Sequence, residues 1–337
     1  MGAKRHQHQT PRFLLRRFAL DDHVTRVHRT QPRKDIGTRA AAVGAHFYSY
    51  RSASGGRSTE IEDFLQRVDS AAAIVIARLA KDDGPVQPLA EKLAEFLAFQ
   101  VVRTARFRSI DLQAAKAVGP ILAGYDTLRS EYGPNAAAWE TSAARRRLDQ
   151  VKADPPLVYR QRPRKNSHVR MMLQYGPPLV PSLVGLRWAV GRTDHPAFCT
   201  SDNPVLHFRT DGDQTFRGIN LAPTSEIRFT LDPHHVLVGA PAHLGPDRFE
   251  ASRELILTTN EGLARECAQA VFHRPGFPVV GVDDMRPSAP PIPPPQVEIR
   301  RGADSEPTLP PVVSDPHIQA ILDRLTAGDD QLPPEYW

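Results

Sequence analysis

Four residues from three distant stretches of the sequence have the chemistry to bind and cleave at a phosphate group. His8 carries an imidazole, which titrates near neutral pH and is suited to moving a proton. Arg16 and Arg103 each offer a planar fork of N–H donors that stays charged, so they are suited to holding negative charge. Asp202 could act as a carboxylate base, a metal ligand or the group that orients His8. The set predicts phosphodiester chemistry, with His8, Arg103 and Asp202 as catalytic residues.

Helical spacing is expected to bring part of this set together. Gln100, Arg103 and Arg106 follow one another at intervals of three, so they share one face of a helix predicted over residues 88–108. On this interpretation, Gln100 and Arg106 help to bind an anion. The alternative is structural, because Arg103 could pair with Asp202 while Gln100 ties down a loop.

A polar turn carries the predicted carboxylate. Ser201, Asp202, Asn203 and Pro204 follow one predicted strand and precede another. Asp and Asn bend a chain by bonding to their own backbone, and the residue before a proline is extended, so the turn could be purely architectural. The functional alternative gives Ser201 and Asn203 the task of shaping the site around Asp202.

Four stretches with these residues resemble the bacterial domain-of-unknown-function 4238 family. The resemblance covers roughly residues 6–275, and Gln9 stands where the family pattern has an aromatic residue. The family has no established activity, so the resemblance implies candidate positions and not a reaction. The matching stretches are His8 to Phe18, Phe96 to Thr104, Phe198 to Val205 and Leu221 to Ser225.

Positive charge is concentrated in two segments. Residues 1–39 and residues 141–175 each carry a net charge of +7, whereas the whole chain carries +5. Two basic segments on an otherwise acidic body predict a polyanionic partner, RNA or DNA, with Arg12 and Arg16 as further anion-binding residues. The alternatives are an ordinary solvated surface and pairing of the basic segments with acidic residues of the same chain.

Familiar catalytic and metal motifs are missing from the sequence. It contains no nucleophile elbow, phosphate loop, dinucleotide fingerprint or zincin helix. His234 and His235 are adjacent near a strand, where neighbouring side chains point to opposite faces, so we expect no metal site there. Cys199 and Cys267 have no metal-type spacing and favour small buried apolar roles. The sequence therefore indicates no metal and leaves the cofactor open.

Hydrophobic periodicity predicts an α+β protein. An N-terminal helical part, residues 1–175, is expected to pack on an antiparallel sheet in residues 176–275, forming one domain over residues 1–285. Residues 286–337 hold twelve of the 32 prolines and predict a flexible tail with one short helix near residues 317–325, suited to contacting partner proteins. Helices are predicted over 59–81, 88–108, 112–132, 139–151 and from 259 or 260 to 272; strands are predicted at 186–190, 197–200, 205–208, 227–231 and 236–239.

Composition limits the class of protein. Of 337 residues, 40% are hydrophobic and 24% charged, which argues against a wholly disordered or membrane-embedded chain. No segment approaches the roughly 20 apolar residues of a membrane span, so a cytosolic protein is expected. The leading hypothesis is nucleic-acid binding with phosphodiester cleavage. The alternative is a non-enzymatic interaction module in which the polar motifs brace the helices against the sheet.

Overall fold

The computed structural model describes residues 6–45, 48, 50–51, 57–58, 60–133, 136–154, 167–209, 225–242, 245–282 and 316–329. Its helices are α1 Arg12–Arg17, α2 Glu60–Ala80, α3 Val86–Val102, α4 Ala105–Tyr132, η1 Ala136–Glu140, α5 Ser142–Ala153, α6 Ser167–Val184, α7 Arg253–Glu266 and α8 Pro316–Asp329. Its strands are β1 His6–His8, β2 His23–His28, β3 Lys34–Gly37, β4 Val43–Ala45, β5 Tyr50–Arg51, β6 Arg57–Ser58, β7 Arg187–Arg192, β8 Thr200–Ser201, β9 Val205–Arg209, β10 Ser225–Asp232, β11 His235–Ala240, β12 Arg248–Glu250 and β13 Ala270–His273.

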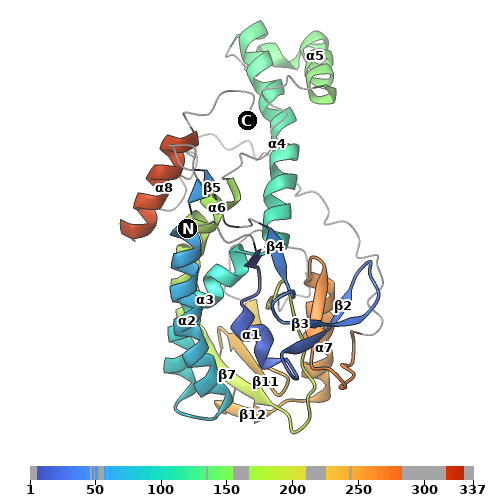
Figure 1. Cartoon of the computed structure of the whole chain (residues 1–337). Helices are drawn as coiled ribbons and strands as arrows, with labels where there is room; N and C mark the ends of the chain where they lie inside the picture. The colour runs from blue at the N-terminus through green and yellow to red at the C-terminus, as the bar shows by residue number, and fades with distance from the viewer. Residues whose placement is uncertain are drawn as a thin grey trace.

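Two larger sheets lie in the lower half of the molecule in Figure 1. One has the strand order β12-β7-β11-β10-β9 and is antiparallel except for the parallel β12–β7 pair. The other has the order β3-β2-β13-β8 and is antiparallel throughout. The predicted α+β class is confirmed. The second sheet joins strands from both ends of the chain, so the sheet is not confined to the C-terminal half as predicted.

The helix predicted over residues 59–81 is confirmed as α2, and it packs beside α3 (Figure 1). Apolar residues recur every three or four positions along α2, including Leu65, Ala72 and Ile76, and they are buried. Helix α3 packs against the first large sheet, where the ring centroids of Phe96 on α3 and Phe229 on β10 are 5.7 Å apart. The Phe96 ring also lies 5.8 Å from the Phe13 ring of α1, so this core fixes α3 relative to the N-terminal segment.

The single helix predicted over residues 88–108 is wrong, because the chain breaks after Val102. Arg103 ends α3 with its backbone N–H bonded to the Phe99 carbonyl oxygen. Thr104 then caps α4, since its hydroxyl accepts the Phe107 N–H at 3.2 Å. The break places Arg106 on a different helix from Gln100 and Arg103.

Helix α6 is missing from the sequence-based prediction, which ends the helical part at residue 175. Pro177, Pro178 and Pro181 lie inside this helix, and prolines ordinarily disfavour helix interiors. Burial against α3 compensates for the lost hydrogen bonds. At Gly176 the helices approach so closely that an added Cβ would lie 2.8 Å from the Phe99 ring.

The helix predicted to start at Thr259 or Asn260 begins earlier, and its predicted end is a strand. Ser252 is the actual N-cap of α7, and its hydroxyl accepts the Leu255 N–H at 3.1 Å. Residues 270–273 are β13, which pairs with β2 and β8. Asn260 lies inside the helix and binds backbone groups of the neighbouring chain segments, including the Cys199 N–H at 3.2 Å.

Helix α4 leads away from the sheets, and α5 packs beside its far end (Figure 1). The C-terminal helix is longer than predicted and belongs to the core, because Ile318, Ile321 and Leu325 of α8 are buried. The rest of the predicted flexible tail lies outside the described residues. Among the described residues, no helix combines the length and apolarity that crossing a membrane requires.

Candidate functional site

A pocket of about 590 Å³ lies between the N-terminal segment, α2 and the end of α3. His8 and Arg103, which the sequence analysis predicts as catalytic residues, both line this pocket. A volume of this order suits a small ligand or one unit of a polymer. The polar part of the wall includes His8, Arg12, Glu62, Gln66, Asp69 and Arg103.

Strand pairing and one side-chain hydrogen bond position His8. β1 runs antiparallel to β4, with His8 opposite Val43. The ring Nδ1 lies 3.1 Å from the Ala41 carbonyl oxygen, and because a carbonyl can only accept, Nδ1 carries the hydrogen. In the neutral ring Nε2 then holds the lone pair, which is the form that takes up a proton.

Arg103 is the largest fully buried side chain in the described residues, with 1% of its side chain exposed. Its Nε donates to Gln100 Oε1 at 2.8 Å, and its Nη2 donates to the same oxygen. Its Nη1 donates to Asp69 Oδ1 at 2.8 Å. The guanidinium carbon lies 5.3 Å from the centroid of the Phe96 ring. A buried charge needs such pairing, so the guanidinium is held in one orientation.

Asp69 is a partner of Arg103 that the sequence analysis does not predict. It lies on α2 with 23% of its side chain exposed, and burial raises its pKa above the ordinary value although Arg103 opposes the shift. The spacing of Asp69 in the sequence could have predicted that it faces the protein interior. Asp69 follows Leu65 by four residues and precedes Ala72 by three, so the helical period turns it toward the buried side of α2.

Two hydrogen bonds bring three distant stretches of the sequence together behind the pocket. Gln100 Nε2 donates to the Gln9 carbonyl oxygen at 3.1 Å. The next residue, Thr10, donates from its hydroxyl to the Ser201 carbonyl oxygen at 2.8 Å. The N-terminal segment is therefore fastened to α3 on one side and to β8 on the other. Gln100 has a structural role, because its side-chain NH₂ group donates to Gln9 and its side-chain oxygen accepts from Arg103.

Arg12 and Arg16 differ in position although both bind Asp22. Arg12 lines the pocket and donates from Nη2 to Asp22 Oδ2 at 2.9 Å. Arg16 donates from Nε to Asp22 Oδ1 at 3.3 Å, is 56% exposed and is not part of the pocket wall. A hydrogen bond from Thr38, assisted by both arginines, lowers the pKa of Asp22 to about 2. Only Arg12 of the two is placed to meet a ligand in the pocket.

Asp202 lies away from the pocket wall and pairs with neither Arg103 nor His8, so both predicted pairings are wrong. Its carboxylate accepts three backbone N–H groups, those of Ala268 and Gln269 at 2.7 Å and that of Ala270 at 3.1 Å. Complete burial raises its pKa to about 6, against the opposing effect of these donors. The carboxylate holds the chain between α7 and β13 in place.

The rest of the polar turn also braces this region. The Ser201 hydroxyl accepts the Asn203 N–H at 3.1 Å, and Asn203 Nδ2 donates to the Glu266 carbonyl oxygen at 3.2 Å. These contacts match the architectural interpretation of the turn. They connect the segment after β8 to the C-terminal end of α7.

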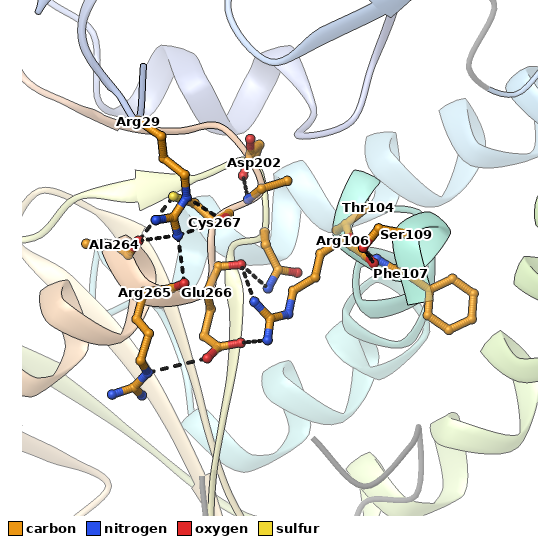
Figure 2. A network of polar contacts seen from close by, with 12 residues as sticks. Arg29, Thr104, Arg106, Phe107, Ser109, Asp202, Ala264, Arg265, Glu266 and Cys267 are labelled. Atoms are coloured by element: carbon orange, nitrogen blue, oxygen red, sulfur yellow. Dashed lines mark hydrogen bonds and ion pairs between the residues drawn. The ribbon is translucent and has the colours of Figure 1, made fainter. Parts of the chain in front are cut away.

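Figure 2 shows the contacts around the end of α7, where Arg106 is found. Arg106 Nη2 lies 2.5 Å from Glu266 Oε2, and its Nη1 donates to the Glu266 carbonyl oxygen at 3.3 Å. Arg29 donates to the carbonyl oxygens of Ala264 and Cys267, both at 2.9 Å (Figure 2). These cations satisfy helix-end carbonyl groups, so Arg106 has a bracing position instead of the predicted anion-binding one.

No group of three or more His, Cys, Asp and Glu residues suited to a metal ion occurs in the part of the chain that the structure describes. His234 and His235 lie with ring centroids 6.4 Å apart, and each ring Nδ1 contacts an oxygen of the protein, on Thr193 and Asp232 respectively. Cys199 and Cys267 are buried thiols, and burial raises both pKa values, that of Cys267 to about 12.

Comparison with known proteins adds a family to this geometry. A family described as protein of unknown function, DUF4238, matches residues 6–277. The chain belongs to that family. The matched DUF4238 region contains the pocket and the residues that contact the end of α7, namely Asp202, Asn203 and Arg106. It ends before α8. No curated protein and no solved structure matches the chain.

The buried carboxyl of Asp202 predicts a pH-dependent stability. Its folded pKa of about 6 lies above the ordinary value of 3.8, so the folded state holds the proton more tightly than the unfolded chain. The protonated Asp202 carboxyl therefore contributes most to the free energy of unfolding below pH 4. That contribution is lost, by up to about 3 kcal/mol, as pH rises through 6. Urea unfolding of the wild type and Asp202→Asn between pH 4 and 7 measures it.

The free energy of unfolding of the wild type minus that of Asp202→Asn should fall as pH rises from 4 to 6, because only the wild type has the titrating carboxyl. The exposed α5 substitution Asp149→Asn is the control and should give a flat difference. A difference that instead grows over this range would mean that the three N–H donors outweigh burial, so that the folded state favours the charged carboxylate.

Proposed function

We propose that this protein binds single-stranded or double-stranded nucleic acid at the pocket and hydrolyses a phosphodiester bond there. The observation that carries the proposal is that His8, Arg12 and Arg103 all lie in the wall of one pocket. A histidine beside two guanidinium groups combines proton transfer with stabilisation of negative charge. The protein is accordingly proposed to be a nuclease-like hydrolase of the cytoplasm, where thiols such as Cys199 and Cys267 stay reduced.

The two guanidinium groups have different parts in this proposal. Arg12 is 24% exposed and offers the accessible donor to a phosphate oxygen, in competition with Asp22. Arg103 lies deeper, and three of its five N–H donors are used by Gln100 and Asp69. Its positive charge is partly offset by Asp69, so Arg12 supplies most of the charge that stabilises a phosphate, while Arg103 holds the wall behind it in one orientation.

His8 would move the proton. Water attacks the phosphorus atom and gives a proton to Nε2, while the Ala41 carbonyl steadies the Nδ1–H side of the ring. As the bond from phosphorus to the leaving oxygen breaks on the opposite side of the phosphorus atom, a solvent water gives that oxygen a proton, and the imidazolium then releases its own proton to solvent. One proton enters and leaves the ring, so His8 ends in its starting state.

The second candidate is a non-enzymatic interaction module. It is favoured by the contacts of Gln100, Asp202 and Arg106, which all satisfy groups within the protein. Partner proteins would then bind through the proline-rich tail, whose residues 286–315 lie outside the described residues. Under this alternative, substitutions in the pocket would leave nucleic-acid binding unchanged.

Arg12→Gln and Arg16→Gln form a matched pair of binding tests. Both remove a cation that contacts Asp22, but only Arg12 lines the pocket. We expect Arg12→Gln to weaken oligonucleotide binding roughly tenfold and to lower the slope of log K against log salt by about 1. Arg16→Gln should change both quantities much less. Equal effects of the two substitutions would contradict binding at the pocket, and fluorescence anisotropy at several salt concentrations measures them.

His8→Asn tests the proton-transfer role. The asparagine amide can still donate to the Ala41 carbonyl but cannot transfer a proton near neutral pH, so cleavage of labelled RNA or DNA should fall by roughly 10²–10⁴-fold with the fold intact. His23→Asn is the control, because the His23 ring also contacts a backbone carbonyl, that of Asp21, and is exposed. A wild-type protein inert on all nucleic acids, with or without added divalent metals, would exclude the enzyme.

A further inference from the structure

The hairpin of β2 and β3 carries positive charge outside the pocket. Residues 23–37 contain four Lys and Arg residues against one Asp, which gives a net charge of +3 with neutral histidines. Two of the four cations have partners elsewhere in the protein. Arg29 donates to carbonyl oxygens at the end of α7, and Arg33 Nη2 lies 3.1 Å from His273 Nε2. The other two cations are Arg26 and Lys34.

Arg26 and Lys34 lie directly opposite each other in the antiparallel pair of β2 and β3. Opposed residues share one face of the sheet, and like charges in that arrangement repel. In the part of the chain that the structure describes, the single side-chain hydrogen bond of this pair runs from Arg26 Nη2 to the neutral Gln31 Oε1 at 2.7 Å. Asp35 belongs to the other face, where it accepts the Thr25 hydroxyl. An anion bound to both cations would therefore relieve their repulsion.

The positive charge of Arg26 also acts on His28, which follows it by two residues and shares its face. Burial, and after it the charge of Arg26, lowers the pKa of His28. His28 Nδ1 accepts the Thr30 N–H at 3.1 Å, so the neutral ring carries its hydrogen on Nε2. Arg26, His28 and Lys34 thus give this face hydrogen-bond donors, which suit a phosphate.

The same face leads to the pocket, because the hairpin lies beside α1, the helix that begins at Arg12 (Figure 1). Thr38 continues the strand pairing, since its N–H donates to the Asp22 carbonyl oxygen at 2.8 Å. Side chains alternate along a strand, so Lys34 and Thr38 share a face about 13 Å apart. The Thr38 hydroxyl accepts Nε–H of Arg12, the pocket arginine, at 3.1 Å. A single phosphate cannot span this distance, but a strand of several nucleotides can.

We propose that the β2–β3 hairpin binds the nucleic-acid strand beyond the pocket, with Arg26 and Lys34 contacting its phosphates. The inference rests on the proposed nucleic-acid function, and it names a polymer instead of a single nucleotide as the substrate. Charge complementarity supports it, because each cation that meets a phosphate adds affinity that falls with salt. Arg16 adds less, since Asp22 offsets its charge.

The test compares thymidine single strands of three and eight nucleotides, with phosphorothioate linkages that resist cleavage. Fluorescence anisotropy at fixed salt should show the wild type binding the longer strand at least about tenfold more tightly. Arg26→Gln combined with Lys34→Gln should weaken binding of the longer strand about tenfold and lower its slope of log K against log salt by about 1.4. Binding of the shorter strand should change less than about twofold, which also shows that the variant is folded.

The matched control is Lys81→Gln combined with Lys92→Gln. It removes the same charge from exposed positions outside the pocket wall and the hairpin, so binding of both strands should stay unchanged. If the hairpin variant unfolds, Lys34→Gln alone decides, because Lys34 is exposed at the edge of the sheet. It should lower the salt slope of the longer strand by about 0.7, and an unchanged slope would overturn the hairpin site.

The other outcomes separate this inference from the proposal beneath it. Equal effects of the two double variants on the longer strand overturn the hairpin site, while the pocket still stands if Arg12→Gln weakens binding of both strands. Equal wild-type affinity for the two lengths, or binding of the longer strand alone, also overturns the hairpin site. A poly-glutamate peptide that displaces the labelled strand as well as unlabelled strand does overturns the assignment of this face to nucleic acid. Failure of the wild type to bind either strand overturns both proposals.

Discussion

The burial of one guanidinium group governs the region around the pocket. Arg103 is 1% exposed, and a buried charge of this kind must be neutralised and hydrogen-bonded. Gln100 and Asp69 meet that demand from α3 and α2, and the Tyr48 hydroxyl donates to the Arg103 carbonyl oxygen at 3.0 Å. Because Gln100 also donates to Gln9, the same group of contacts fixes the segment that carries His8. The pocket wall thus depends on the pairing of Arg103.

Residues of the stretches that resemble the family divide into two sets by what they contact. His8 and Arg103 border the pocket, whereas Asp202 and Asn203 bind backbone groups around the end of α7. Thr10 connects the sets through its hydrogen bond to the Ser201 carbonyl. The contacts of Asp202 and Asn203 therefore help to position the N-terminal segment, and through it the position of His8 in the pocket wall depends on them.

Local patterns in the sequence are sufficient for several elements and for the types of the pocket residues. The period of α2 follows from burial of one helix face, and the apolar runs of β10 and β11 follow from burial of successive strand residues, so these elements can be predicted. The chemistry of His8 and Arg103 follows from their side chains alone. Helix α6 cannot be predicted in this way, because its prolines argue against a helix and tertiary packing, mainly on α3, compensates for them.

Partner choice is harder to predict than residue type, because it depends on tertiary packing. Asp202 is an obvious carboxylate for Arg103, but the tight connection between α7 and β13 places three backbone N–H groups around it. Asp69 pairs with Arg103 instead, from a helix whose charged residues resemble an ordinary solvated face. The break at Thr104 likewise brings Arg106 to Glu266, which no helical spacing predicts.

The dependence of the pocket wall on Arg103 can be measured in a double-mutant cycle with Asp69. Urea unfolding of Asp69→Leu, Arg103→Met and the double variant gives the coupling free energy of the pair. We expect each single substitution to cost about 3–5 kcal/mol, because it leaves a buried charge without its partner, and the double variant to cost several kcal/mol less than their sum. Additive costs, agreeing within about 0.5 kcal/mol, would show that the pair does not hold this region together.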